Sequence, residues 1–190
     1  MVFCIFDIIN DMNIFSDPQK IISQCSGYIM GKNIADLGAG SGAFTMAAAQ
    51  LGKSENGKIY AVDVQKDLLD KINADAQNEH LSSVHVVWGN FEETHGTRLK
   101  DDSIDTVILA NTLFQVENKK DAITEIKRIL KKGGVCIVVD WSESFGNIGP
   151  KSDHVVIQDT AQKLFTDHNF VISKSIETGE HHYGFIATHN

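Results

Sequence analysis

The apolar positions of this chain follow two periods, which alternate along most of its length. Short continuous runs rich in Val and Ile span residues 33–38, 58–64, 84–90, 104–111 and 135–141. Between them, apolar residues recur every three to four positions over 43–52, 66–80 and 119–134. The segment 91–103 is weakly patterned, and we expect a short helix there. Continuous apolar strands separated by amphipathic helices are typical of a parallel sheet covered by helices on both faces.

The two ends of the chain depart from this alternation. Asp17 followed by Pro18 is a helix-start signal and predicts an N-terminal helix over 17–30. After the fifth strand we expect a loop over 142–154, which we interpret as a lid, and a helix over 154–169. Two strand-like runs around "ETGE" in residues 170–190 predict an antiparallel hairpin, and hence a reversed last strand.

The composition fits one globular domain. The chain has 190 residues, of which 42% are hydrophobic and 22% charged, and this is enough for a single substantial core. We therefore expect one domain over 1–190, made of the N-terminal helix (17–30), a core (33–141) and a C-terminal part (142–190). The net charge of −8 argues against a broad surface for nucleic acid, so a nucleic-acid partner is not expected.

The scattered cysteines, and an N-terminus without the features of a signal peptide, favour a cytoplasmic protein. Cys4, Cys25 and Cys136 are scattered and form no CxxC pair, which favours reduced thiols over a disulfide framework or a zinc site. The segment "MVFCIFDIIN" lacks a basic start and a cleavage site, so we expect it to pack on the domain or on a partner. Since no run reaches the roughly 20 apolar residues that span a bilayer, no membrane partner is expected.

The most informative segment is a glycine-rich loop between the first strand and the first helix of the core, "ADLGAGSGAFT" (35–45). No lysine follows the glycines, which excludes a loop of the G-x-x-x-x-G-K-[ST] type. Gly38, Gly40 and Ala43 satisfy the dinucleotide pattern G-x-G-x-x-G/A, and Asp63 at the end of the next strand stands near the position of a ribose-binding acid. By spacing alone, an NAD-type ligand fits.

Asp36 changes this balance, because it lies near the end of a buried strand, just ahead of the first glycine. A buried carboxylate costs several kcal/mol unless it is paired or hydrogen-bonded, and it would repel a pyrophosphate. A ligand with an ammonium and a sulfonium group would be attracted instead. S-adenosylmethionine is such a ligand, and its ribose hydroxyls also suit Asp63. The alternative is that Asp36 only caps the following turn.

The sequence resembles the class I, Rossmann-like S-adenosylmethionine-dependent methyltransferases over most of residues 17–141. The matching segments are "ADLGAGSGAFT", "VDV", "WGN", "ILANTLFQV" and "EIKRILKKGGVCIVVDW", in the order and spacing of that family. The resemblance implies a three-layer α/β fold with a seven-stranded sheet in the order 3-2-1-4-5-7-6, mostly parallel, with the last strand antiparallel. It also implies S-adenosyl-L-methionine as the cofactor.

The loop after the fifth strand is similar to that of a narrower subset, the small methyltransferases of the ubiquinone- and arsenite-methylating groups. The similarity rests on the "DW…GP" segment (140–150). Lys151 and His154 stand where the subset usually has a second proline and a nearby arginine. The three scattered cysteines also do not supply the cluster that arsenite methylation needs, so the subset's substrates are not carried over.

The resemblance implies roles for residues at the ends of the first four strands. The loop backbone would pack against the methionine part and the ribose of the cofactor, through Gly38, Ala39, Gly40, Ser41 and Gly42. Asp36 would orient the amino group, and Asp63 would accept hydrogen bonds from the ribose hydroxyls.

The adenine and the sulfonium would contact residues of the next two strand ends. Val64 and Phe91 would flank the adenine, and Asn90 would bind its amino group through the side-chain oxygen. Asn111 would lie near the sulfonium. For Asn90 and Asn111 the alternative is that they only form turns after their strands.

The sequence defines the acceptor side less well. Methyl transfer needs the nucleophile in line with the methyl group at about 3–3.5 Å, with water excluded. Because the sulfonium is a good leaving group, a general base is optional, and the catalytic candidates are His154, Asp140 and Asn111, with Phe114 as an apolar wall. His181 and His182 lie on opposite faces of the last strand, so we expect packing at the strand end and no metal site.

We therefore expect a methyltransferase that acts by in-line displacement on an unidentified acceptor, with a small molecule favoured. A non-catalytic S-adenosylmethionine-binding module remains open, as does an NAD(P)-dependent oxidoreductase. Against the latter, the Tyr-x-x-x-Lys pair of short-chain dehydrogenases occurs here as Tyr28 and Lys32, ahead of the glycine loop. The acceptor and the oligomeric state do not follow from the sequence.

Overall fold

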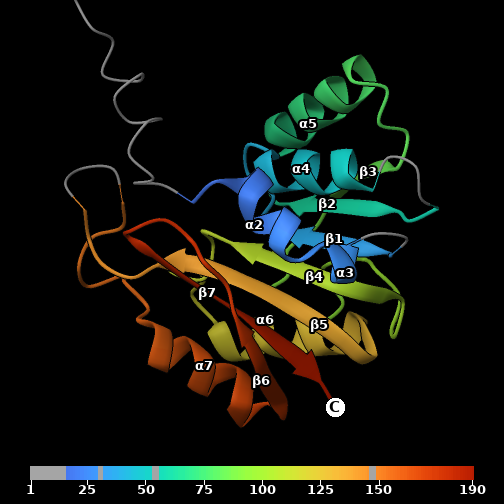
Figure 1. Cartoon of the computed structure of the whole chain (residues 1–190). Coiled ribbons are helices and arrows are strands. Elements are labelled where there is room, and N and C mark those ends of the chain that lie inside the picture. Colours follow the sequence, from blue (N-terminus) through green and yellow to red (C-terminus); the bar gives the residue numbers. More distant parts are fainter. Residues whose placement is uncertain (1–15, 30–31, 53–55, 146–148) are drawn as a thin grey trace, which may run out of the picture.

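A computed structural model describes residues 16–29, 32–52, 56–145 and 149–190 (Figure 1). Its helices are α2 (Pro18–Gln24), α3 (Ser26–Ile29), α4 (Ala43–Leu51), α5 (Lys66–Asn78), α6 (Lys119–Ile129) and α7 (Gln158–Asp167). Its strands are β1 (Ile34–Leu37), β2 (Ile59–Asp63), β3 (Val84–Trp88), β4 (Ile104–Ala110), β5 (Leu130–Trp141), β6 (Phe170–Ser175) and β7 (His182–His189).

The strands form one sheet in the order β3-β2-β1-β4-β5-β7-β6. All neighbouring pairs are parallel except those of β7, which runs antiparallel to both β5 and β6. Helices α2 to α5 lie on one side of the sheet and α6 and α7 on the other (Figure 1). This confirms the expected fold, including the strand order and the reversed last strand.

Two apolar cores separate the three layers, and the strands supply both of them. On β4, Val107 and Leu109 pack in the core under α6 and α7, whereas Ile108 packs in the core under α2 and α4. The same alternation holds on β5, since successive side chains of a strand point to opposite faces. Burying each such side chain contributes about 1.5–3 kcal/mol. Continuous apolar strands are therefore required here, because both faces of the sheet are covered.

The N-terminal helix was predicted as one element over 17–30, and the structure divides it into α2 and α3 at Cys25. The predicted start is confirmed, since Asp17 Oδ1 accepts hydrogen bonds from the backbone N–H groups of Gln19 (2.9 Å) and Lys20 (3.2 Å). The prediction that the segment before Ser16 packs on the domain or on a partner lies outside the described residues.

The helix predicted over 119–134 was too long. Helix α6 ends at Ile129, and the next residue, Leu130, has extended backbone angles, is fully buried and pairs with Ile104 of β4. The pairing of β4 with β5 then shifts register before it resumes at Thr106 and Val135. Tertiary pairing with β4 thus overrides the helical periodicity of the last predicted turn.

Two further elements differ from the prediction. Helix α7 begins only at Gln158, after an extended Ile157, rather than at residue 154. The segment 91–103 contains turns and no helix. The predicted lid over 142–154 is described only in part, because residues 146–148 lie outside the described ranges, and its role as a lid stays a prediction.

Candidate active site

A cavity of about 540 Å³ opens at the carboxyl ends of β1, β2 and β4. Most of the predicted binding residues line it: Asp36, Gly38, Ala39, Gly40, Ser41, Asp63, Val64, Asn90, Phe91 and Asn111. Parallel strands place their carboxyl ends at one edge of the sheet, which is where ligands bind in open α/β sheets. Gly42, by contrast, is not among the lining residues.

The glycine loop has a backbone that other residues would strain. Gly38, Gly40 and Gly42 all have positive φ, at 69°, 53° and 83°. A Cβ on Gly38 would lie 2.5 Å from Thr112 Cγ2, and one on Gly42 would lie 2.6 Å from Ile72 Cγ1. The lack of a side chain at Gly38 therefore allows Thr112, just after β4, to approach the loop. The lack of one at Gly42 allows Ile72 of α5 to pack against it.

Asp36 is buried below the loop and is hydrogen-bonded to the first turn of α4. Its Oδ2 accepts a hydrogen bond of 2.5 Å from Thr45 Oγ1. Burial raises the pKa of Asp36 to about 6, although the bonds from Thr45 oppose this shift. Asp36 thus holds the start of α4, as the turn-capping alternative requires, and it also lines the cavity.

Asp63 ties the glycine loop to the end of β2. Its Oδ2 accepts a hydrogen bond from the backbone N–H of Gly40 and its Oδ1 accepts one from Gln65, each 2.9 Å long. Each carboxylate oxygen can accept more than one hydrogen bond, so the carboxylate keeps capacity for a ligand. Val64, next along the chain, is 56% exposed at the rim.

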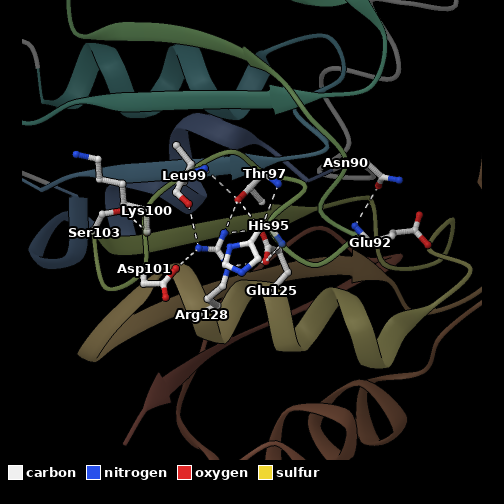
Figure 2. Close-up of polar contacts among 10 residues, drawn as sticks. All are labelled: Asn90, Glu92, His95, Thr97, Leu99, Lys100, Asp101, Ser103, Glu125 and Arg128. Atoms are coloured by element: carbon white, nitrogen blue, oxygen red, sulfur yellow. Dashed lines mark hydrogen bonds and ion pairs between the residues drawn. The ribbon is translucent and has the colours of Figure 1, made fainter.

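Asn90 and Phe91 form the wall after β3. The Asn90 side chain accepts a hydrogen bond from Glu92 N (3.0 Å, Figure 2) and donates one to Glu93 Oε1 (2.9 Å). Asn90 therefore forms a turn after β3, which was the alternative to a role in adenine binding. Its side-chain oxygen already accepts one hydrogen bond, from Glu92 N. Phe91 is buried and contributes an apolar surface to the cavity.

A buried polar network on α6 fixes the loop that follows Phe91 (Figure 2). Glu125 accepts hydrogen bonds from His95 N (2.9 Å), Thr97 N (3.1 Å), Thr97 Oγ1 (2.6 Å) and Arg128 Nη2 (2.7 Å). Burial alone would raise the pKa of Glu125, but the bonds from Arg128, Thr97 and His95 lower it to about 2. The backbone N–H groups of His95 and Thr97 thus donate to a side chain of α6 rather than to carbonyls within a helix, and the predicted helix does not form.

The far end of the cavity is formed by the ends of β4, β5 and β7. Asn111 has a positive φ of 53° and donates a hydrogen bond of 3.3 Å to Ser16 Oγ, while its Oδ1 is buried without a partner in the described residues. Trp141 and His182 are opposite each other in the β5–β7 pair, and their rings lie 4.2 Å apart between centroids. Both line the cavity.

The other two catalytic candidates are not among the lining residues. Asp140 is buried beneath the cavity, where its carboxylate accepts hydrogen bonds from the backbone N–H groups of Trp141 (2.7 Å) and Phe114 (3.2 Å). Burial raises its pKa to about 6. Asp140 thus fixes the loop after β4, in which Gln115 and Val116, rather than Phe114, line the cavity. His154 is exposed.

Sequence reasoning missed several lining residues, above all His182, for which packing at a strand end was expected. Its place in the cavity depends on β7 running antiparallel beside β5, which brings the start of β7 to the carboxyl end of the sheet. Ser16, Pro18, Thr112 and Gln115 also line the cavity. Of these, only Thr112 stands next to a predicted residue that does line the cavity, Asn111, and could have been identified from that position.

The charges of the cavity are of one sign. Asp36, Asp63 and Glu92 line it, and the described lining residues include no lysine or arginine. Such a cavity attracts a ligand of net positive charge and disfavours one of net negative charge such as a pyrophosphate, since no cation balances the added charge. Across the described ranges, no three side chains of the metal-ligating types gather at one place.

Comparison with known proteins agrees with this chemistry. A family model described as "Methyltransferase domain" matches residues 30–183. The chain belongs to this family. The interpretation of the sequence as a methyltransferase rather than an oxidoreductase is thereby confirmed at the level of the family.

Individual relatives are more distant. The chain is 29% identical over 145 residues to the ubiquinone/menaquinone biosynthesis C-methyltransferase UbiE of Vibrio parahaemolyticus. The aligned region covers 73% of this chain and 53% of that protein. The chain thus spans about half the length of the curated relatives it matches.

Two solved structures show how widely the fold is shared. A SAM dependent methyltransferase from Aquifex aeolicus superposes with a TM-score of 0.80 at 23% identity, over 92% of this chain and 90% of its own. The [4+2]-cyclase SpnF superposes with a TM-score of 0.73 at 14% identity, over 90% and 80%. At these identities the similarity shows the fold alone, and the function is argued from the site.

Proposed function

We propose that the methyltransferase domain binds S-adenosyl-L-methionine in this cavity and transfers its methyl group to a small-molecule acceptor. The observation that carries the proposal is the combination of a strained glycine loop with a cavity lined by three acids and by no described lysine or arginine. A sulfonium and an ammonium group suit such a cavity, whereas the pyrophosphate of NAD does not.

The cofactor side of the cavity is the side of β1 and β2. Asp63 accepts hydrogen bonds from the ribose hydroxyls while it holds Gly40, and Asp36 attracts the amino group directly or through water. The loop backbone from Gly38 to Gly42 supports the methionine part and the ribose. Val64, Asn90 and Phe91 surround the adenine.

The bound cofactor supplies a methyl group on a positively charged sulfur, which is already activated toward a nucleophile. The protein then has to align the acceptor and exclude water. Asn111 faces the sulfonium with an oxygen that has no partner in the described residues, and Val116 and Trp141 supply apolar walls. His154 and Asp140 stay candidates for proton transfer, although the described cavity is lined by neither.

The relatives favour a small-molecule acceptor, because their name places them in ubiquinone and menaquinone biosynthesis. None of the described helices has the length and hydropathy needed to cross a bilayer. A cytoplasmic location and the lack of a nucleic-acid partner remain predictions from the sequence.

The decisive experiment compares cofactors by calorimetry. We expect S-adenosylmethionine to bind the wild-type chain more tightly than NADH. We expect Asp63→Asn to weaken that binding by about 10- to 100-fold, because a charge-assisted hydrogen bond is lost. The control is Asp70→Asn, which changes an exposed acid on α5 by the same chemistry and should bind as wild type does.

Transfer itself is measured as release of S-adenosylhomocysteine in the presence of a panel of small molecules. Tighter binding of NADH would overturn the assignment of the cofactor. Cofactor binding without transfer to any member of a broad panel would favour a non-catalytic binding module.

A further inference from the structure

One end of the cavity carries an imidazole that the cofactor side does not use. His182 is 8% exposed and lies at the start of β7, with its ring against Trp141. Both of its ring nitrogens are buried and have no hydrogen-bond partner among the described residues. Buried polar atoms are nearly always paired, so an orphaned imidazole at a cavity wall requires an explanation.

The neighbouring histidine provides a contrast. His181 Nδ1 lies 2.8 Å from Glu143 Oε1, and its ring stacks on Phe145. His181 lies in the turn just before β7 and is occupied by Glu143 and Phe145, whereas His182, the first residue of β7, lines the cavity. Of the two, only His182 is placed to meet a ligand.

The surroundings of His182 keep its ring neutral. Burial and, to a smaller extent, the nearby His181 lower the pKa of His182 to about 4. No acid forms an ion pair with it among the described residues. A neutral imidazole offers one N–H donor and one lone pair, which matches the donor and acceptor pair of a hydroxyl group.

We propose that His182 is the acceptor-binding residue of this methyltransferase domain, and that it holds a hydroxyl group of an uncharged, largely apolar molecule. With three acids and no lysine or arginine in the described lining, the cavity disfavours an acceptor of net negative charge. Trp141, Phe91 and Val116 also line the cavity and give it apolar walls. This inference rests on the proposed function, since it assigns the acceptor end of the same cavity.

The test uses three naphthalene probes that differ in one group: 2-naphthol, 2-methoxynaphthalene and 2-naphthoate. Each is titrated calorimetrically into the full chain, with and without saturating S-adenosylhomocysteine. We expect 2-naphthol to bind about tenfold more tightly than the methoxy probe, which lacks the donor, and the naphthoate to bind weakest.

His182→Phe keeps a ring but removes both nitrogens. It should reduce the affinity for 2-naphthol about tenfold, so that it equals that for 2-methoxynaphthalene, and leave S-adenosylhomocysteine binding unchanged. His182→Gln restores a donor and an acceptor and should recover part of the preference. His181→Phe is the matched control in the turn before β7, outside the cavity lining, and should bind all three probes as wild type does.

Melting temperatures separate this role from a structural one. Since the nitrogens of His182 have no described partner, His182→Phe should not lower the melting temperature of the ligand-free chain. A lowered melting temperature, equal binding of 2-naphthol and its methyl ether to wild type, or no saturable binding of 2-naphthol would each overturn the proposal. Failure of S-adenosylhomocysteine to bind would instead overturn the proposed function, because the ranking of the probes is also measured without it.

Discussion

The two ends of the cavity differ in how their polar groups are satisfied. At the cofactor end, Asp36 is bonded to Thr45, and Asp63 is bonded to Gly40 and Gln65. At the acceptor end, Asn111 Oδ1 and both nitrogens of His182 have no partner in the described residues. The first end is preorganised by its own hydrogen bonds, whereas the second leaves polar atoms for a ligand to pair.

The difference follows from how each end is built. The cofactor end comes from β1, its loop and β2, which are close in sequence and carry two of the five matching segments. The acceptor end joins Ser16, Asn111, Trp141 and His182, which come from four distant parts of the chain. Four predictions test whether the two ends behave as separate units, from the largest expected effect to the smallest.

The largest effect is expected at the glycine loop. In Gly38→Ala the new Cβ would clash with Thr112 at 2.5 Å, in a backbone with a φ of 69°. We expect a loss of about 2–4 kcal/mol in unfolding free energy and loss of measurable S-adenosylmethionine binding in calorimetry.

The matched control for this change is Gly133→Ala. Gly133 also has a positive φ, of 77°, but nothing lies within 4 Å of its added Cβ. It should lose only about 1–2 kcal/mol from backbone strain and keep cofactor affinity. If both variants lost the same unfolding free energy, backbone strain alone would account for the need for glycine at position 38, and the close approach of Thr112 would not contribute.

Next comes the network that fixes the loop after Phe91. Glu125→Gln leaves Arg128 without its buried carboxylate, so we expect a loss of about 3 kcal/mol in unfolding free energy by urea denaturation. Because this loop supports the adenine wall, the affinity for S-adenosylmethionine should fall severalfold. The affinity for 2-naphthol should not change, and an equal fall for both ligands would contradict the separation of the two ends.

A smaller effect concerns pH. The folded pKa of Asp36 is raised to about 6, above its ordinary value, so this group destabilises the folded chain as pH rises through that value. Its contribution to the unfolding free energy should fall by about 1 kcal/mol between pH 5 and pH 7.

Asp36→Asn removes this titration, so the unfolding free energy of the variant should fall less over the same pH range than that of wild type. Its affinity for S-adenosylmethionine should decrease at pH 7, where wild-type Asp36 is ionised. Identical pH profiles of stability for the two proteins would disprove the assignment to Asp36. Asp140, whose pKa is also raised to about 6, titrates alike in both proteins and cancels in the comparison.

The smallest effect is expected for Tyr183, whose hydroxyl is also buried without a partner in the described residues but which does not line the cavity. Tyr183→Phe should change the unfolding free energy by less than about 1 kcal/mol and leave cofactor and probe affinities unchanged. A loss of 2-naphthol affinity here would extend the acceptor end beyond the residues assigned to it.

The success and failure of sequence prediction follow the same division. The central strands were predicted because both faces of the sheet are covered there, which makes β1, β4 and β5 continuous apolar runs. The strand order was expected only from the resemblance to a known family. The boundary between α6 and β5 was wrong because Leu130 fits a helical period but pairs with Ile104. The helix expected in 91–103 is absent because Glu125 and Arg128 satisfy this loop from α6.

The candidate site shows the same contrast. Asp36, Asp63, Gly38 and Gly40 lie in segments whose pattern is local, so they could be predicted as a group, and all four line the cavity. His154 was favoured for its chemistry alone, and the structure leaves it exposed and outside the cavity lining. His182 was set aside, because nothing near it in the sequence shows that it faces Trp141.

The sequence by itself determined the alternation of strands and helices and the glycine loop with its buried acid, because periodicity, glycine and a buried acid act over a few residues. The tertiary structure alone decided which side chains meet at the acceptor end. That end depends on the antiparallel register of β7 on β5, which brings His182 to Trp141 across forty residues of chain. The antiparallel direction of β7 was expected, but the register that sets His182 opposite Trp141 is fixed by packing over the whole sheet, and no local pattern in the sequence shows it.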